Sequence, residues 1–284
     1  MVSLQTAHPI SHHFTLNKNL ENMWVHLNSS SPSLRKEWQI TSSDKMQALR
    51  LKLHQHNAVY RNPSSGEIVE SYPLVPPSTL LGLISTILKQ QELKNSSFNL
   101  SIQGTYGALI RDYQWHKKYD KEIGSYQDHR YPLLIHTLYD VNLLLHIFTH
   151  ERPMLVRLES LFKNPPYFLY LGRAEDIVKI NEVKIVDIKR QKLIQSQRLS
   201  YNAYMQPDEA EAMRIGGVRY NLTSFYRFVP WTIRKQTKII RDFEWTEVSY
   251  VEKGAKIELD YDSDIECWSD GENLLWWSLP NPPQ

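Results

Sequence analysis

The sequence predicts an α+β fold. After residue 45, the expected elements follow the order strand, helix, strand, strand, helix, strand. This β-α-β-β-α-β order is typical of ferredoxin-like (RRM-type) domains. A polar stretch, residues 111–132, interrupts the order between the second and third strands and is interpreted as an insertion. Residues 190–284 follow the last of these strands and are expected to form a mostly β carboxyl-terminal region.

The first strand is predicted from Ala48 to Tyr60, where "ALRLKLHQHNAVY" alternates apolar and polar residues. The helix that follows begins in "YPLVPPSTLLGLI", residues 72–84. Prolines keep the chain extended there, and Ser78 is a suitable N-cap residue. Gly82 interrupts the apolar face of this helix, and we expect it to admit a close backbone. The free N–H groups of the helix end suit a phosphate; capping of a core helix is the simpler alternative.

The later elements follow from the same patterns. Residues 98–110 ("FNLSIQGTYGALI") and 138–150 ("LYDVNLLLHIFTH") predict the second and third strands. Residues 151–166 predict a helix, because one proline suits its first turn and two consecutive prolines end it. Residues 167–188 predict one or two further strands.

Three regions result: an amino-terminal extension (1–45), a ferredoxin-like domain (46–189) and the β-rich region (190–284). The net charge is unevenly distributed along them. Residues 173–241 carry 14 Lys/Arg against 7 Asp/Glu, whereas residues 242–284 carry 2 against 11. A basic middle followed by an acidic end favours a polyanion-binding surface. Two complementary solvated faces would explain the same charges.

Composition excludes several classes of protein. The single cysteine, Cys267, cannot form an internal disulfide, and no CxxC or Cys/His cluster suggests a zinc site. No apolar run reaches membrane length, and residues 1–20 lack a signal-peptide core. We therefore expect a cytoplasmic protein without a membrane partner, a metal or another cofactor.

Several stretches together resemble the Cas five family of CRISPR-associated proteins. These are the Tyr60–Arg61 pair at the end of the first strand, "YPLVPPSTLLGL", and "YLGRAEDIV" at residues 170–178. Members of that family belong to the RAMP superfamily of RNA-binding proteins and are subunits of the type I surveillance complex, Cascade. The resemblance implies a ferredoxin-like fold with a protruding thumb hairpin, and residues 111–132 are where that thumb belongs.

The resemblance also implies partners. Family members bind the 5′ handle of the CRISPR RNA, next to the Cas seven backbone subunit and the large subunit of the Cas eight type, and meet target DNA only indirectly. They generally begin at the first strand, so residues 1–45 have no counterpart. Met46 stands where a family-like chain would start. Either translation begins at Met46, or residues 1–45 form a real arm.

Residues 111–132 interleave cations with aromatic rings, which bind phosphates and stack on splayed bases, respectively. A solvated loop with inward-packed rings is the alternative. Arg61 is expected near the helix end, where it would pair with a phosphate or with Glu67 or Glu70. The predicted RNA-binding residues are Tyr60, Arg61, Ser78, Arg111, Tyr113, Trp115, His116, Lys117, Lys118, Arg130, Arg214 and Arg219.

Three further features allow two interpretations each. Arg173 could contact RNA, but nearby Glu175 and Asp176 favour a structural role, with Gly172 allowing a tight bend. Gly216–Gly217, between Arg214 and Arg219, suits either close approach to an anion or a plain hairpin turn. The carboxyl-terminal segment contains three tryptophans, Trp268, Trp276 and Trp277. We expect them to pack in the core by default, and a protein interface is the alternative.

The sequence predicts no enzyme, since it contains no Walker A, HExxH or GxSxG motif. Some members of the family cut precursor CRISPR RNA without metal, using histidine, lysine and tyrosine. His116 and Lys117, with Tyr60 or Tyr72 nearby, could supply these residue types here. A metal-independent endoribonuclease is therefore the alternative to a non-catalytic RNA-binding subunit.

Overall fold

The computed structural model describes residues 46–89, 98–120, 125–233, 236–258 and 265–279, which belong to one compact unit. The predicted amino-terminal extension lies outside these residues. The strands are β1 (Met46–Ala58), β2 (Asn99–Thr105), β3 (Ala108–Asp120), β4 (Ser125–Phe148), β5 (Lys179–Lys192), β6 (Asn202–Met205), β7 (Val218–Ile233), β8 (Gln236–Val251), β9 (Glu266–Ser269) and β10 (Leu274–Leu275). The helices are α2 (Pro77–Leu88), α3 (Arg152–Lys163) and α4 (Pro207–Ala212).

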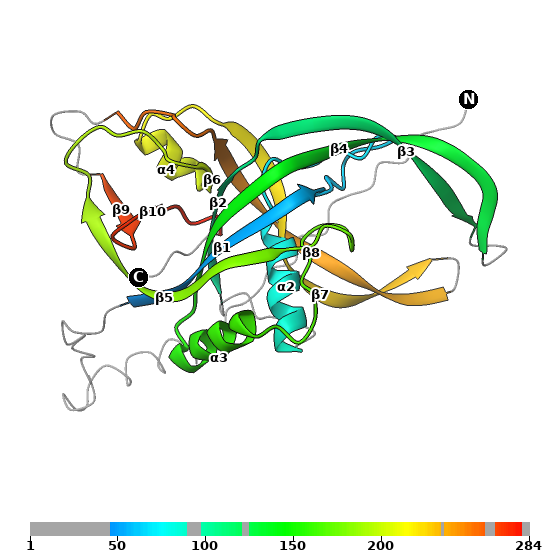
Figure 1. The fold of residues 1–284 in the computed structure, drawn as a ribbon, viewed down its shortest axis with the longest axis horizontal. Helices are drawn as coiled ribbons and strands as arrows, with labels where there is room; N and C mark the ends of the chain where they lie inside the picture. The colour runs from blue at the N-terminus through cyan, green and yellow to red at the C-terminus, as the bar shows by residue number, and fades with distance from the viewer. Residues whose placement is uncertain (1–45, 90–97, 121–124, 234–235, 259–264, 280–284) are drawn as a thin grey trace, which may run out of the picture. The chain divides into compact units, whose positions relative to one another are not determined.

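The strands form one antiparallel sheet in the order β10-β9-β5-β1-β4-β2-β6-β8-β7, and β3 pairs with β4 (Figure 1). The four strands of the predicted β-α-β-β-α-β order lie together in the middle, as β5-β1-β4-β2. The carboxyl-terminal region extends this sheet at both edges, because β6 pairs with β2 and β9 pairs with β5. A mostly antiparallel sheet with few helices agrees with the predicted α+β class.

The main core lies between this sheet and two helices. Leu49, Leu51 and Leu53 alternate along β1 and pack in one buried cluster with Ile84 of α2 and Leu158 of α3. This alternation is the period of two that predicted the strand. None of the described helices has the length and apolar character needed to cross a membrane.

The opposite side of β1 packs against the carboxyl-terminal segment. Ala48 shares a second buried cluster with Trp268 and Trp277, and Trp276 is buried in a third cluster. The default prediction of core packing is therefore confirmed for all three tryptophans.

Helix α2 begins two residues earlier than the predicted N-cap, Ser78, implies. Pro76 is the N-cap residue, and no side chain caps the helix. Proline fits the first helical position at Pro77 because its φ is already helical and its missing N–H would have no intrahelical partner. The predicted cap by Ser78 is therefore wrong; its hydroxyl lies 2.6 Å from that of Thr223 in β7. The expected close backbone at Gly82 is also wrong, because a Cβ there would meet nothing within 4 Å.

The predicted second strand is interrupted at Tyr106 and Gly107, where β2 ends and β3 begins. Both strands nevertheless pair with the same strand, β4, in one continuous register. Thr105 lies opposite Asn142, and Ala108 lies opposite Tyr139. β4 therefore extends without interruption from the middle of the sheet into the predicted insertion.

Candidate nucleic-acid interface

The predicted insertion is a two-stranded hairpin of β3 and β4, which we call the thumb. Its pairing sets Arg111 opposite His136, Trp115 opposite Pro132, and Lys117 opposite Arg130. Successive side chains of a strand point to opposite faces, and directly paired residues share a face. One face of the thumb, the thumb face, therefore carries five of the predicted residues: Arg111, Tyr113, Trp115, Lys117 and Arg130.

The aromatic rings of the thumb face are exposed. Tyr113 is 67% and Trp115 is 70% accessible to solvent, so the alternative of inward-packed rings is wrong for both. Cations beside them supply charge for phosphates, and the rings supply flat apolar surface for bases. Lys118 belongs to the same strand, but its side chain lies outside the described part of the chain. The RNA-binding role of these residues stays a prediction.

The opposite face of the thumb borders a hollow of about 650 Å³ at the thumb base. His116 and Tyr131 line it from the thumb, with their ring centroids 6.4 Å apart, and Arg61 and Arg173 line it from the other side. Arg61 is exposed, and in the described structure it forms no ion pair with Glu67 or Glu70. Arg61 and His116 are thus brought together, but on a different face from Trp115.

Arg173 has the structural role that the sequence favoured. Its guanidinium lies 2.9 Å from the Asp176 carboxylate and 3.2 Å from Glu175, and it also donates to Gln114 of the thumb at 3.4 Å. Gly172 allows the bend before it, with a φ of 100°, and the carbonyl oxygen of Val59 leaves no room for a side chain there. A Cβ at position 172 would lie 2.6 Å from that oxygen.

Two tyrosines near the thumb base are buried. The Tyr60 hydroxyl donates to Gln55 Oε1 at 2.5 Å, and its side chain is 1% exposed. The predicted RNA contact by Tyr60 is therefore wrong in this structure. Burial, with a smaller contribution from the Asp176 charge, raises the pKa of Tyr60, and burial raises that of Tyr72. Neither phenol faces His116 from an open surface, as the nuclease alternative expected.

Ser78, Arg214 and Arg219 lie away from the thumb base. Ser78 lines a different hollow from Arg61, so the structure does not assemble the predicted phosphate site from these two residues. Arg214 follows α4 by two residues and has a φ of 53°. Gly216–Gly217 lead from this helix into β7, so they are not a hairpin turn. Arg219 pairs with Glu211 and, at 2.9 Å, with Glu247, which reduces its charge available to an anion.

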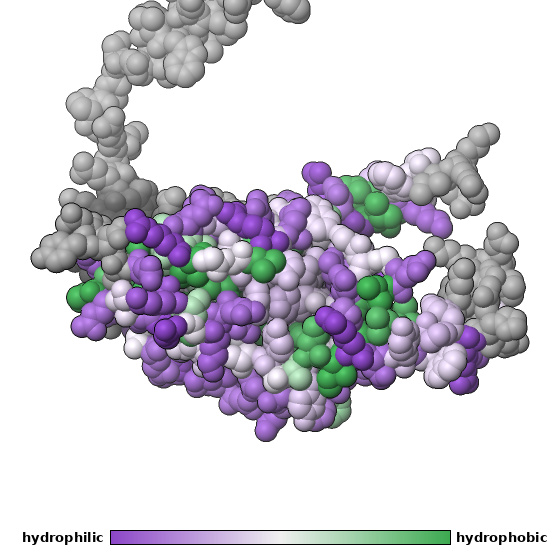
Figure 2. Space-filling model, turned by 90° about the horizontal axis from the view of Figure 1, so that it is seen from above, coloured by the Kyte–Doolittle hydropathy of each residue, from purple (hydrophilic) through white to green (hydrophobic). Residues whose placement is uncertain are grey.

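A second long hairpin, β7–β8, was missed as an element by the sequence reasoning. It extends in the same direction as the thumb (Figure 1), and Figure 2 shows two arms projecting from one end of the described part of the molecule. Arg241 stacks on the ring of Tyr226, 4.9 Å from its centroid. The signal was present in "YRFVPW" and "RDFEW", which interleave cations and aromatics as the thumb does.

The described residues contain no group of three His, Cys, Asp or Glu side chains that could hold a metal ion. The two hairpins present exposed cations and aromatic rings. These groups suit a flexible anionic partner with flat bases, which is single-stranded nucleic acid.

Several solved structures resemble this chain at low sequence identity. A chain of a "CRISPR RNA-guided surveillance complex" is 12% identical, with a TM-score of 0.48, over 76% of this chain and 95% of that chain. A "CRISPR protein from Archaeoglobus fulgidus" is 11% identical, with a TM-score of 0.40, over 81% and 98%. A chain of a type III-B Cmr-beta complex bound to cognate target RNA is 12% identical, with a TM-score of 0.36, over 76% and 90%.

A comparison with curated proteins found no match. A family model matches most of the chain. It is Cas_Cas5d, described as CRISPR-associated protein (Cas_Cas5), and it covers residues 48–234, from β1 to the end of β7. This range includes the thumb and all three stretches that carry the resemblance seen in the sequence. The chain therefore belongs to the CRISPR-associated protein (Cas_Cas5) family.

Proposed function

We propose that this protein is a non-catalytic RNA-binding subunit of a type I CRISPR Cascade complex. It holds the 5′ handle of the CRISPR RNA and caps the backbone, between the Cas seven subunit and the large subunit of the Cas eight type, and it acts in the cytoplasm. The observation that carries the proposal is the thumb face, where three cations flank two exposed rings. Target DNA would meet this subunit only through the rest of the complex.

Two further observations support the proposal. The central strand order β5-β1-β4-β2, with α2 and α3 in one core, is the arrangement that we interpret as ferredoxin-like. One solved structure to which the chain is similar is named as an RNA-guided surveillance complex, and we extend this assembly to the present chain as part of the proposal.

The electrostatic part of the proposal is tested by Lys117→Glu. Binding of repeat RNA would be measured at several salt concentrations. Each phosphate contact to single-stranded nucleic acid contributes about 0.7 to the slope of log affinity against log salt, so we expect a slope lower by roughly that amount and weaker binding. Lys253→Glu reverses an exposed charge outside both hairpins and is the matched control. An unchanged slope would remove Lys117 from the phosphate contacts.

A second candidate function is metal-independent cleavage of precursor CRISPR RNA. It is favoured by the proximity of His116 and Tyr131 in the hollow that Arg61 also lines. Histidine can act as a general base, and arginine can stabilise charge on a phosphate. The buried positions of Tyr60 and Tyr72 oppose it.

We expect repeat RNA to stay intact when incubated with the purified protein and a chelator. The readout is denaturing electrophoresis of end-labelled RNA over several hours. Cleavage at one position that disappears in His116→Ala, but persists in His150→Ala, would establish the nuclease and overturn the non-catalytic proposal. His150 is an exposed histidine outside the thumb, so its variant controls for a nonspecific loss of activity.

A further inference from the structure

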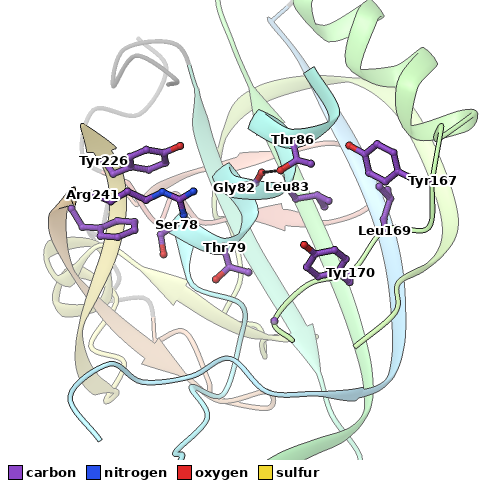
Figure 3. Close-up of a pocket in the computed structure, with 12 residues that line it drawn as sticks. Ser78, Thr79, Gly82, Leu83, Thr86, Tyr167, Leu169, Tyr170, Tyr226 and Arg241 are labelled. Carbon is purple, nitrogen blue, oxygen red and sulfur yellow. Dashed lines mark hydrogen bonds between the residues drawn. The ribbon is translucent and has the colours of Figure 1, made fainter. Parts of the chain in front are cut away.

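A second hollow, of about 400 Å³, lies beside α2. We call it the α2 hollow. Its floor is the outer side of α2, and its walls come from residues 167–172 and from the β7–β8 hairpin. Figure 3 shows Tyr167 and Tyr170 on one side of the helix, and Tyr226 and Arg241 on the other. Its volume lies within the range of about 300–1,000 Å³ that is usual for small-molecule sites.

The walls of the α2 hollow offer flat rings and one cation. Tyr226 and Phe243 come from the hairpin, and their ring centroids lie 5.5 Å apart. Arg241 stacks on Tyr226 and is the only charged residue among the described residues that line the hollow. Aromatic faces on both sides of a space suit a planar ring, and a guanidinium that no lining carboxylate neutralises suits a phosphate.

One position on the floor of the α2 hollow has no side chain, although the surrounding packing would admit one. Gly82 occupies the middle of α2, and a Cβ there would meet nothing within 4 Å. Glycine is less favourable than alanine inside a helix. The backbone at this position is ordinarily helical and the space around it is free. Neither the backbone conformation nor close packing therefore requires a glycine there. It leaves room above the helix, between the tyrosines.

We propose that the α2 hollow binds one unstacked base of a single-stranded RNA, with Arg241 on the adjoining phosphate. The inference rests on the proposed function, because the RNA would be the one that the thumb face holds. The base would enter between Tyr170 on one side and the Arg241–Tyr226 pair on the other, while the thumb face contacts the neighbouring part of the strand. The single-base site differs from the thumb face, where the rings are exposed on an open strand surface.

The test uses repeat RNA that carries the fluorescent base 2-aminopurine at each position in turn. A base that enters an aromatic site changes its fluorescence, so we expect one position to respond strongly on binding. Gly82→Leu fills the hollow and should abolish this response, while the melting temperature is retained. Ser160→Leu adds the same side chain at an exposed position of another helix, α3, that does not line the α2 hollow, and should leave the response unchanged. Arg241→Ala, a hairpin surface change, should weaken the response at least several-fold even if Gly82→Leu folds poorly.

The outcomes separate this inference from the proposed function. A response that Gly82→Leu and Arg241→Ala leave intact would overturn the α2 hollow as a base site, although the repeat RNA still binds. An unrelated RNA of equal length, labelled in the same way, is the second probe. If it responds as strongly as the repeat, the base site stands and the handle-specific function fails. If neither RNA binds the wild-type protein, both proposals fail.

Discussion

Replacing Tyr113 and Trp115 together by alanine is expected to produce the largest loss of RNA binding. A ring stacked on a base contributes about 1–3 kcal/mol, so each substitution should weaken binding by about 5- to 150-fold, and the pair by at least about 30-fold. Both rings are more than half exposed, so the free energy of unfolding should change little. Equilibrium binding of repeat RNA and thermal unfolding of the same samples provide the two measurements.

The matched control for this pair is Phe168→Ala. Phe168 is 85% exposed and lies outside both hairpins, so its removal deletes an exposed ring without touching the thumb face. We expect no change in RNA affinity for it. Equal affinity of the Tyr113/Trp115 double variant and the wild type would mean that the thumb face does not stack on RNA.

Asp270→Ala is expected to have the largest effect on stability. The Asp270 side chain is fully buried and accepts hydrogen bonds from Arg50, at 2.9 Å, and from His146 Nε2, at 3.0 Å. It also accepts backbone N–H bonds from Glu272 and Asn273. Its removal leaves the buried His146 Nε2 and the turn N–H groups without an acceptor, although Arg50 keeps its other carboxylate contacts. Breaking a buried pair of this kind typically costs about 3–5 kcal/mol. We expect the free energy of unfolding in urea to fall by about that amount.

Glu272→Ala is the control for the buried pair. Glu272 also contacts Arg50, at 2.9 Å, but its side chain is 61% exposed. Exposed ion pairs contribute at most about 1 kcal/mol, so this variant should remain close to the wild type. A similar loss in both variants would show that the Arg50 contacts are equivalent and that burial of Asp270 is not decisive.

The same cluster predicts that the free energy of unfolding decreases as the pH is lowered. Burial lowers the pKa of His146, against the opposing hydrogen bond with Asp270. Below about pH 6.5 the unfolded chain therefore binds a proton that the folded protein excludes. Burial alone would raise the pKa of Asp270, but hydrogen bonds from His146 and Arg50 hold it well below its usual range. Its contribution is present above about pH 4 and is lost as pH falls further, so urea unfolding should become easier from about pH 7 to 3.

The central elements could be predicted because each has one buried face. Leu49, Leu51 and Leu53 alternate along β1, and α2 follows its prolines directly. The thumb lacks this contrast, since both of its faces meet solvent along much of its length. Its sequence therefore shows no clear apolar pattern, although its cations and rings recur at every second residue, which is the period of a strand.

The candidate site could be predicted only in part for a similar reason. The thumb residues lie within one short stretch of sequence, and their composition identified them. Outside the site, the same limit applies to the buried cluster of Arg50, His146 and Asp270, which lie 96 to 220 residues apart in the sequence and share no local pattern. The same holds for the α2 hollow, where Tyr170 and Tyr226 approach α2 from separate segments.

The uninterrupted pairing along β4 restricts how the thumb can vary in length. Pairing in the sheet, where Asn142 lies opposite Thr105, fixes the side to which each residue of the strand points. The same register continues into the thumb, where Arg130 lies opposite Lys117. Deleting one residue from each strand near the thumb base would turn Tyr113, Trp115 and Lys117 to the other side. Related thumbs that keep the same contacts should therefore differ by even numbers of residues in each strand, unless a bulge restores the phase.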